Sequence, residues 1–134
     1  YENAGHYGWH GFLDGSDDDE HAARAKGALE RAHAILDASA AADRSTPLDP
    51  EGPPEDGVDM LVVDEILYAA NRGLIEPDDV VDLIRSKPED LELVLTGGHD
   101  APEYVFEHAD LVSEVGKVKH PLDAGHPARK GTEY

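Results

Sequence analysis

The sequence contains no cysteine, few basic residues and few aromatic ones. The lack of cysteine excludes disulfides, thiolate zinc sites, iron–sulfur clusters and cysteine nucleophiles. Eleven Lys and Arg residues stand against thirty Asp and Glu residues, so the formal net charge is -19. A chain this acidic repels nucleic acid and anionic membrane surfaces. We therefore expect neither as a partner.

Long apolar runs are missing too. No stretch approaches the roughly 20 apolar residues that cross a membrane, and no positively charged leader precedes an apolar stretch. These features predict a cytoplasmic protein. The excess of acids is typical of a very salty cytosol, because salt screens the repulsion between carboxylates. We expect a halophilic source, and we interpret the acidic run 17–20 first as solvated surface and second as a metal site.

The hydrophobic residues fall in periodic blocks, as in a folded chain. They make up 40% of 134 residues, which is enough for a single domain with one modest core. Residues 1–16 are rich in glycine and aromatic residues and predict a loop. Residues 18 to about 42 predict a long helix with an Ala-rich apolar face. The Pro-rich stretch 44–57 predicts a surface linker or an insertion within the domain.

Beyond residue 57, short apolar runs alternate with amphipathic ones. This alternation predicts an α/β domain with a right-handed parallel sheet and flanking helices. The expected strands are 60–64, 91–97 and 111–115, and the expected helices are 65–73, 77–87 and 101–109.

Four polar or glycine residues stand at the carboxyl ends of the first two expected strands, where parallel sheets bind ligands. Asp64 and Glu65 follow an apolar strand, which is the Walker B pattern for holding Mg²⁺ beside a nucleotide. The same acids can instead cap the following helix. Thr96 and Gly97 either let the backbone approach a ligand closely or form a tight turn. The residues alone leave both alternatives open.

The C-terminal stretch 117–134 concentrates basic residues in an otherwise acidic chain. It holds four of the eleven, namely Lys117, Lys119, Arg129 and Lys130. Local positive charge against this background indicates an anionic ligand such as a polyphosphate. A solvated tail is the alternative interpretation.

Four stretches resemble consecutive parts of one known family. They are "LVVDEILYAANRGLI", "ELVLTG", "APEYVFEHADLVSEV" and "VKHPLDAGHPARKGTEY". Together they resemble the second half of the P-loop type of ATP:corrinoid adenosyltransferases, in unbroken order from about Asp59 to Tyr134. The spacing Lys-His-x-x-Asp-Ala-Gly-x-x-Ala-x-x-Gly-x-x-Tyr at the end is more specific than the Walker B strand. The resemblance implies a P-loop NTPase-like (RecA-like), three-layer α/β/α fold.

The resemblance also implies an activity with ATP and a corrinoid as substrates. In this family the cobalt(I) of the corrinoid attacks the 5' carbon of ATP and expels triphosphate, so no side chain has to act as a base or nucleophile. The protein supplies positioning and neutralises charge on the leaving group. By motif position, Glu65 would help to hold Mg²⁺ on the triphosphate and Asp64 would support it.

Further site residues follow from the same motif positions. Thr96, Gly97, Lys119, His120 and Asp123 would lie near the nucleotide. An aromatic loop lies against the corrinoid in this family, and its candidates here are Trp9 and Phe12. The family also implies a homodimer and a reductase partner that delivers the electron to cobalt(II).

The sequence departs from the family pattern in three places. No Gly-Lys-Thr or Gly-Lys-Ser occurs, and the chain begins at Tyr1 without Met, so we expect the N-terminal strand and phosphate loop to be missing and MgATP to bind poorly to these residues alone. Gly98 replaces an arginine, and Trp9 precedes Phe12 with a different spacing. Two other classes stay open: a fragment of another P-loop ATPase or kinase, and a non-catalytic binding module with the same fold.

Overall fold

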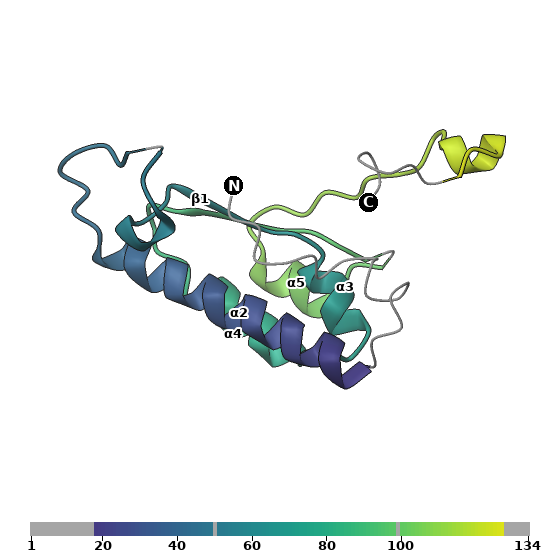
Figure 1. The fold of residues 1–134 in the computed structure, drawn as a ribbon, viewed down its shortest axis with the longest axis horizontal. Coiled ribbons are helices and arrows are strands. Elements are labelled where there is room, and N and C mark those ends of the chain that lie inside the picture. Colours follow the sequence, from purple (N-terminus) through teal and green to yellow (C-terminus); the bar gives the residue numbers. More distant parts are fainter. Residues whose placement is uncertain (1–17, 50, 99, 128–134) are drawn as a thin grey trace.

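The computed structural model describes residues 18–49, 51–98 and 100–127 (Figure 1). Helix α2 (Asp18–Ala41) has 24 residues and agrees with the expected helix to within one residue at its C-terminal end. Its apolar face recurs at helical spacing and packs inward through Ala25, Leu29, Ala32 and Leu36. The predicted glycine and aromatic loop, with Trp9 and Phe12, lies outside the described residues.

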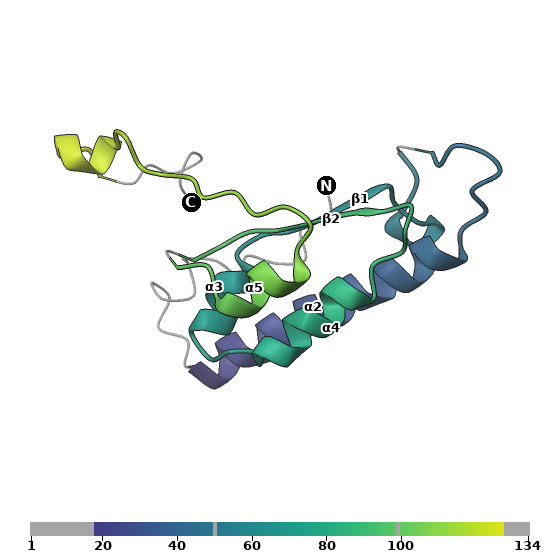
Figure 2. The ribbon, with the colours of Figure 1, turned by 180° about the vertical axis from the view of Figure 1, so that it is seen from behind.

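Strands β1 (Met60–Val63) and β2 (Glu92–Leu95) form a two-stranded parallel sheet. Met60 pairs with Glu92 and Val63 with Leu95 at the two ends of the ladder. The other α-helices of the described residues are α3 (Ile66–Asn71), α4 (Pro77–Arg85) and α5 (Glu103–His108). Together with α2 they lie on the same side of the sheet (Figures 1 and 2). The prediction of a parallel α/β domain with flanking helices is confirmed.

Alternate strand residues face this helical layer. Leu61, Val63, Leu93 and Leu95 pack against two groups of buried side chains. The first group surrounds the sheet end next to α3 and α5, and the second lies between α2, α4 and the opposite end of the sheet. Their buried members are Ala25, Ile66, Leu67, Ala70, Ile75, Val80 and Val105 in the first group, and Leu29, Ala32, Leu36, Leu83 and Leu91 in the second.

Local sequence fixes the connection between α3 and α4. Gly73 has a φ of 72°, a left-handed conformation that glycine adopts without steric cost. Pro77 opens α4, and a reciprocal capping box joins Glu76 to Asp79: the Glu76 N–H donates to Asp79 Oδ2 at 3.0 Å, and the Glu76 carboxylate accepts a backbone N–H in return. The turn therefore returns the chain along the sheet toward β2.

The Pro-rich stretch is tied to the body by ion pairs. It contains one short 3₁₀ helix, η1 (Pro54–Asp56), which the proline content did not predict. Arg31 of α2 pairs with Glu55 at 2.7 Å, and Arg44 pairs with Asp59 at 2.6 Å. Backbone hydrogen bonding and the Arg31 side chain hold the pKa of Glu55 below its usual value. The stretch forms an anchored surface loop.

The prediction of a third strand at 111–115 is wrong. These residues pair with no strand in the described part of the chain, and Leu111 and Val115 are 83% and 93% exposed. The local pattern favours a strand, but a strand forms only where a neighbouring backbone completes the hydrogen-bond ladder. The described residues also show helices on one face of the sheet only, so two of the three layers implied by the resemblance are present (Figures 1 and 2).

Replacing Leu83 by alanine tests the core. Leu83 is fully buried where α4 faces α2 and the sheet. Leu83→Ala should lower the free energy of unfolding by about 2–5 kcal/mol, because it removes buried methyl groups and leaves a cavity. Urea unfolding followed by circular dichroism measures this loss. Leu122→Ala is the control, since Leu122 is 65% exposed and its truncation should change stability by less than about 0.5 kcal/mol.

Candidate functional site

The carboxyl ends of β1 and β2 bring three predicted site residues together. The Thr96 N–H donates to the Val63 carbonyl oxygen at 3.2 Å and extends the ladder by one step. The Thr96 hydroxyl donates to Asp64 Oδ1 and accepts from the Glu65 N–H at 3.0 Å. One hydroxyl therefore fixes both residues relative to β2, because it donates to the Asp64 carboxylate and accepts from the Glu65 backbone N–H.

Glu65 has a left-handed backbone. Its φ and ψ are 61° and 14°, and among the described residues it is the one non-glycine residue with a positive φ. This conformation costs an L-residue about 1–2 kcal/mol, so the surrounding hydrogen bonds must hold it. Glu65 is also the N-cap of α3, but its side chain makes no capping hydrogen bond. Helix capping therefore does not account for this acid.

Gly97 packs tightly against the turn that carries the acids. Its φ is 122°, and an added Cβ would lie 2.8 Å from Tyr68 N and 3.0 Å from Glu65 Cα. The sequence left two alternatives for Gly97, a close approach to a ligand and a tight turn. In the structure Gly97 lies close to the protein's own backbone, so it forms the tight turn. Gly98 extends the same packing, because its Cβ would lie 2.9 Å from Asn71 Nδ2.

The donor set at this edge suits a magnesium ion. Asp64 and Glu65 are both exposed, and the Thr96 hydroxyl orients one of the two carboxylates. Mg²⁺ is bound in proteins through one or two carboxylates, with phosphate and water oxygens completing an octahedron. The described residues contain no cluster of three or more His, Asp or Glu side chains placed to hold a metal. The edge thus offers a pair of oxygen ligands to a cation that brings other ligands with it.

The predicted tail residues lie apart from this edge. Residues 111–127 are exposed throughout, and the 3₁₀ helix η2 (Pro121–Ala124) projects away from the sheet (Figures 1 and 2). Lys117 Nζ pairs with Asp123 at 2.9 Å, and His120 Nδ1 accepts from the Leu122 N–H at 3.1 Å. The structure therefore joins Asp64, Glu65, Thr96 and Gly97, but it does not bring Lys119, His120 or Asp123 to them.

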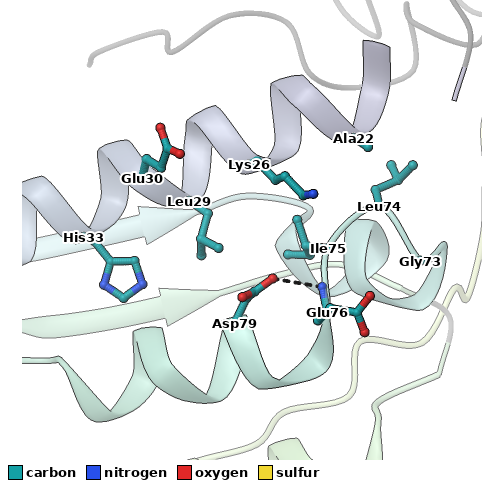
Figure 3. Close-up of a pocket in the computed structure, with 10 residues that line it drawn as sticks. All are labelled: Ala22, Lys26, Leu29, Glu30, His33, Gly73, Leu74, Ile75, Glu76 and Asp79. Carbon is teal, nitrogen blue, oxygen red and sulfur yellow. Dashed lines mark hydrogen bonds between the residues drawn. The ribbon is translucent and has the colours of Figure 1, made fainter. Parts of the chain in front are cut away.

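A cleft that the sequence did not predict lies between α2 and the start of α4 (Figure 3). Its volume is about 570 Å³, and it contains none of the predicted site residues. Lys26 and His33 of α2 face Glu76 and Asp79 across it, but both of these acids belong to the α4 capping box. Only the pairing of two helix faces creates this cleft, so no local motif could have revealed it.

The close packing of Gly97 gives a stability prediction. Gly97→Ala should destabilise the fold by about 1–3 kcal/mol, because alanine disfavours a positive φ and its Cβ would collide with backbone atoms of the Glu65 turn. Thermal and urea unfolding measure the change. Gly116→Ala is the matched control: no atom lies within 4 Å of its added Cβ, and it should leave stability within about 0.5 kcal/mol. Equal effects of the two substitutions would contradict the packing described here.

Comparison with known proteins gives the family of this chain. The profile of the family described as ATP:corrinoid adenosyltransferase BtuR/CobO/CobP matches residues 2–134. The corrinoid adenosyltransferase of Pseudomonas aeruginosa is 38% identical over 77 residues, which cover 58% of this chain and 37% of the relative. That of Escherichia coli is 31% identical over 80 residues, covering 60% and 40%.

An uncharacterised protein of Nostoc is 40% identical over 62 residues, covering 46% of this chain and 16% of the relative. No solved structure matches significantly. The chain thus aligns with two fifths or less of the length of these relatives. With a profile match that spans almost every residue, the chain belongs to the ATP:corrinoid adenosyltransferase family.

Proposed function

We propose that these residues form part of an enzyme of adenosylcobalamin biosynthesis that transfers the 5'-deoxyadenosyl group of ATP to the cobalt(I) of a corrinoid. A cobalt–carbon bond forms, the bond from the 5' carbon to oxygen breaks, and triphosphate leaves with the electron pair. The observation that carries the proposal is the meeting of Asp64, Glu65 and Thr96 at the carboxyl edge of a parallel sheet, in a chain that belongs to this family.

The role of the carboxylate edge is to bind the leaving group through Mg²⁺. Bound there, the ion would neutralise negative charge that builds up on the departing triphosphate. Glu65 is the proposed ligand and Asp64 its supporting partner, held in place by the Thr96 hydroxyl. Thr96 and Gly97 keep the turn against β2, so the two acids keep their spacing when the nucleotide binds.

The exposed tail is the proposed source of positive charge. Lys119, His120 and Asp123 belong to the most specific motif of the chain and lie on a segment that makes few contacts with the body. We propose that the tail folds toward the sheet edge when nucleotide binds, because a polyphosphate attracts its lysines. Trp9 and Phe12 are the proposed contacts to the corrinoid, since aromatic rings cover a planar macrocycle well.

The wider setting follows the family and the composition. We propose a cytoplasmic homodimer, and a separate reductase that delivers the electron which reduces cobalt(II) to cobalt(I). The net charge of -19 supports a halophilic source, where concentrated salt screens the repulsion among the acids. Among the described residues, no helix combines the length and the apolar character needed to cross a membrane.

The role of Glu65 is tested in the natural gene product that contains these residues. Mixing it with cobalt(I) corrinoid and MgATP should replace the cobalt(I) absorption bands by those of a light-sensitive cobalt–carbon product. Glu65→Gln should slow this reaction about 10-fold or more, since removing one electrostatic contact to a leaving group costs at least this much. Glu89→Gln, an exposed acid before the opposite end of β2, should leave the rate unchanged. ATP hydrolysis without a cobalt–carbon product would identify a different P-loop enzyme.

Thr96 offers a second, more conservative pair of variants. Thr96→Val removes the hydroxyl that orients Asp64 and should weaken Mg²⁺-dependent ATP binding about 10- to 100-fold, as is usual for groups that position metal ligands. Thr96→Ser retains the hydroxyl and should bind within about threefold of the parent. Calorimetric titration with MgATP and with ATP plus chelator measures both. Weakened binding by Thr96→Ser, with binding retained by Thr96→Val, would show that packing of the threonine methyl group, and not the hydroxyl, matters.

A further inference from the structure

Asn71, the last residue of α3, makes a long-range hydrogen bond to the chain that leaves β2. Its side-chain amide Nδ2 donates to the Asp100 carbonyl oxygen at 3.0 Å, across 29 positions of the sequence. Asn71 is exposed, and neither the Walker B pattern nor the tail motif includes it. We call residues 96–98 and 100, which follow β2, the exit segment. The Asn71 amide joins the far end of this segment to α3.

The near end of the exit segment is joined to the start of α3. The Leu67 N–H donates to the Thr96 carbonyl oxygen at 3.1 Å. Between the two hydrogen bonds, Gly97 packs so closely that an added Cβ would lie 2.8 Å from Tyr68 N and 3.0 Å from Glu65 Cα. The exit segment thus lies along α3 and contacts the residue with the left-handed backbone. A bond that holds the segment against α3 therefore also supports the turn at Glu65.

The Asn71 amide also occupies the space that a side chain at position 98 would need. Gly98 has a φ of 80°, and its added Cβ would lie 2.9 Å from Asn71 Nδ2 and 3.2 Å from the Asp100 carbonyl oxygen. Because the amide is the end of a flexible side chain, a Cβ at this position would push it off its acceptor. The hydrogen bond therefore requires glycine at 98. The departure from the arginine of the family pattern has a structural counterpart in Asn71.

We propose that Asn71 is a positioning residue of the carboxylate edge. Its amide holds the exit segment against α3, and the segment holds Glu65 in the conformation that presents its carboxylate to Mg²⁺. Asn71 is not a metal ligand, since it acts only through the backbone of the segment. The benefit to metal binding rests on the proposed function, whereas the support of the Glu65 turn is a property of the fold.

A role limited to α3 fits Asn71 less well. Asparagine often serves the end of its own helix, but the Asn71 amide donates to a distant carbonyl oxygen. The C-cap of α3 is Arg72, whose backbone N–H bonds within the helix. Alanine is also the better helix former, so Asn71→Ala should leave the helix and the global stability nearly unchanged. A change at Glu65 in this variant would therefore report on the exit segment.

Amide hydrogen exchange in the natural gene product that contains these residues tests the proposal without nucleotide. The Glu65 and Leu67 amides both donate to the exit segment. In Asn71→Ala their exchange should become about 3- to 10-fold faster, as expected for the loss of one side-chain hydrogen bond. The Glu92 amide, at the opposite end of the β1–β2 ladder, is the internal reference. Asn71→Gln retains a donor amide and should stay within about twofold of the parent.

Ser86→Ala is the matched control. Ser86 is also exposed, stands at the end of a helix and donates its side chain to a backbone carbonyl oxygen, that of Asp82, at 2.7 Å. Its removal should leave exchange of the Glu65 amide within about twofold of the parent, because the lost bond lies outside the exit segment. Unfolding curves of all variants confirm that global stability is retained.

A double-mutant cycle with Gly98→Ala tests whether the two residues act through one hydrogen bond. An alanine Cβ at 98 would displace the Asn71 amide and add the strain of a positive φ. Gly98→Ala alone should therefore accelerate exchange of the Glu65 amide at least as much as Asn71→Ala. Adding Asn71→Ala to Gly98→Ala should change this rate by less than about twofold, because the bond is already lost.

Nucleotide binding extends the test to the metal. Asn71→Ala should weaken binding of MgATP about 3- to 10-fold and leave binding of ATP with chelator unchanged, since only the metal contact depends on Glu65. Asn71→Gln should bind MgATP like the parent. Calorimetric titration measures both. An equal loss with and without chelator would assign Asn71 to the nucleotide itself and overturn the positioning role.

Three further results would overturn the proposal. They are unchanged exchange of the Glu65 amide in Asn71→Ala, an equal acceleration in Asn71→Gln, and effects of Asn71→Ala and Gly98→Ala that multiply in the double variant. The exchange measurements use neither ATP nor a corrinoid. If the parent protein bound no MgATP, that result would count against the proposed function, and exchange would still decide whether Asn71 holds Glu65.

Discussion

The parallel ladder between β1 and β2 creates the carboxylate edge. Because the two strands run in the same direction and in register from Met60 with Glu92 to Val63 with Leu95, their C-terminal residues arrive at the same place. The Thr96 hydroxyl then connects both sides, as donor to Asp64 and acceptor from the Glu65 N–H. An antiparallel pairing of the same strands would put the acids and Thr96 at opposite ends. Topology, more than any single side chain, assembles the site.

Much of this was predictable from the sequence, because the relevant information is local or follows from handedness. Helical spacing gave α2 to within one residue at its C-terminal end, and apolar runs located β1 and β2. The meeting of Asp64 with Thr96 followed from the parallel topology alone. The left-handed backbone of Glu65 could not be predicted in this way, because it depends on a hydrogen bond to a segment about thirty residues away. The prediction of a strand at 111–115 was wrong for the same reason. Its apolar pattern is a local feature, but strand pairing depends on a distant segment.

The strain at Glu65 is informative because its supports are identifiable. The Glu65 N–H bonds to the Thr96 hydroxyl, and the Leu67 N–H bonds to the Thr96 carbonyl oxygen at 3.1 Å. Gly97 packs directly under the turn, where any side chain would collide with it. A strained residue that is held on several sides, with an exposed carboxylate that caps nothing, has the features of a functional position. A purely structural turn at this point would favour glycine, which carries no such strain.

Charge decides how such an edge can serve a polyphosphate. Two exposed carboxylates in a chain of net charge -19 repel ATP, and the repulsion acts at close range, where salt screens it least. A divalent cation between the acids and the phosphates reverses the sign of the local interaction, so binding of nucleotide and binding of cation become coupled. Under the proposed function, Lys117 and Lys119 of the exposed tail add positive charge. Under the proposed function, the acids therefore act only with the cation. The reaction then needs no side-chain base, since the corrinoid cobalt supplies the nucleophile.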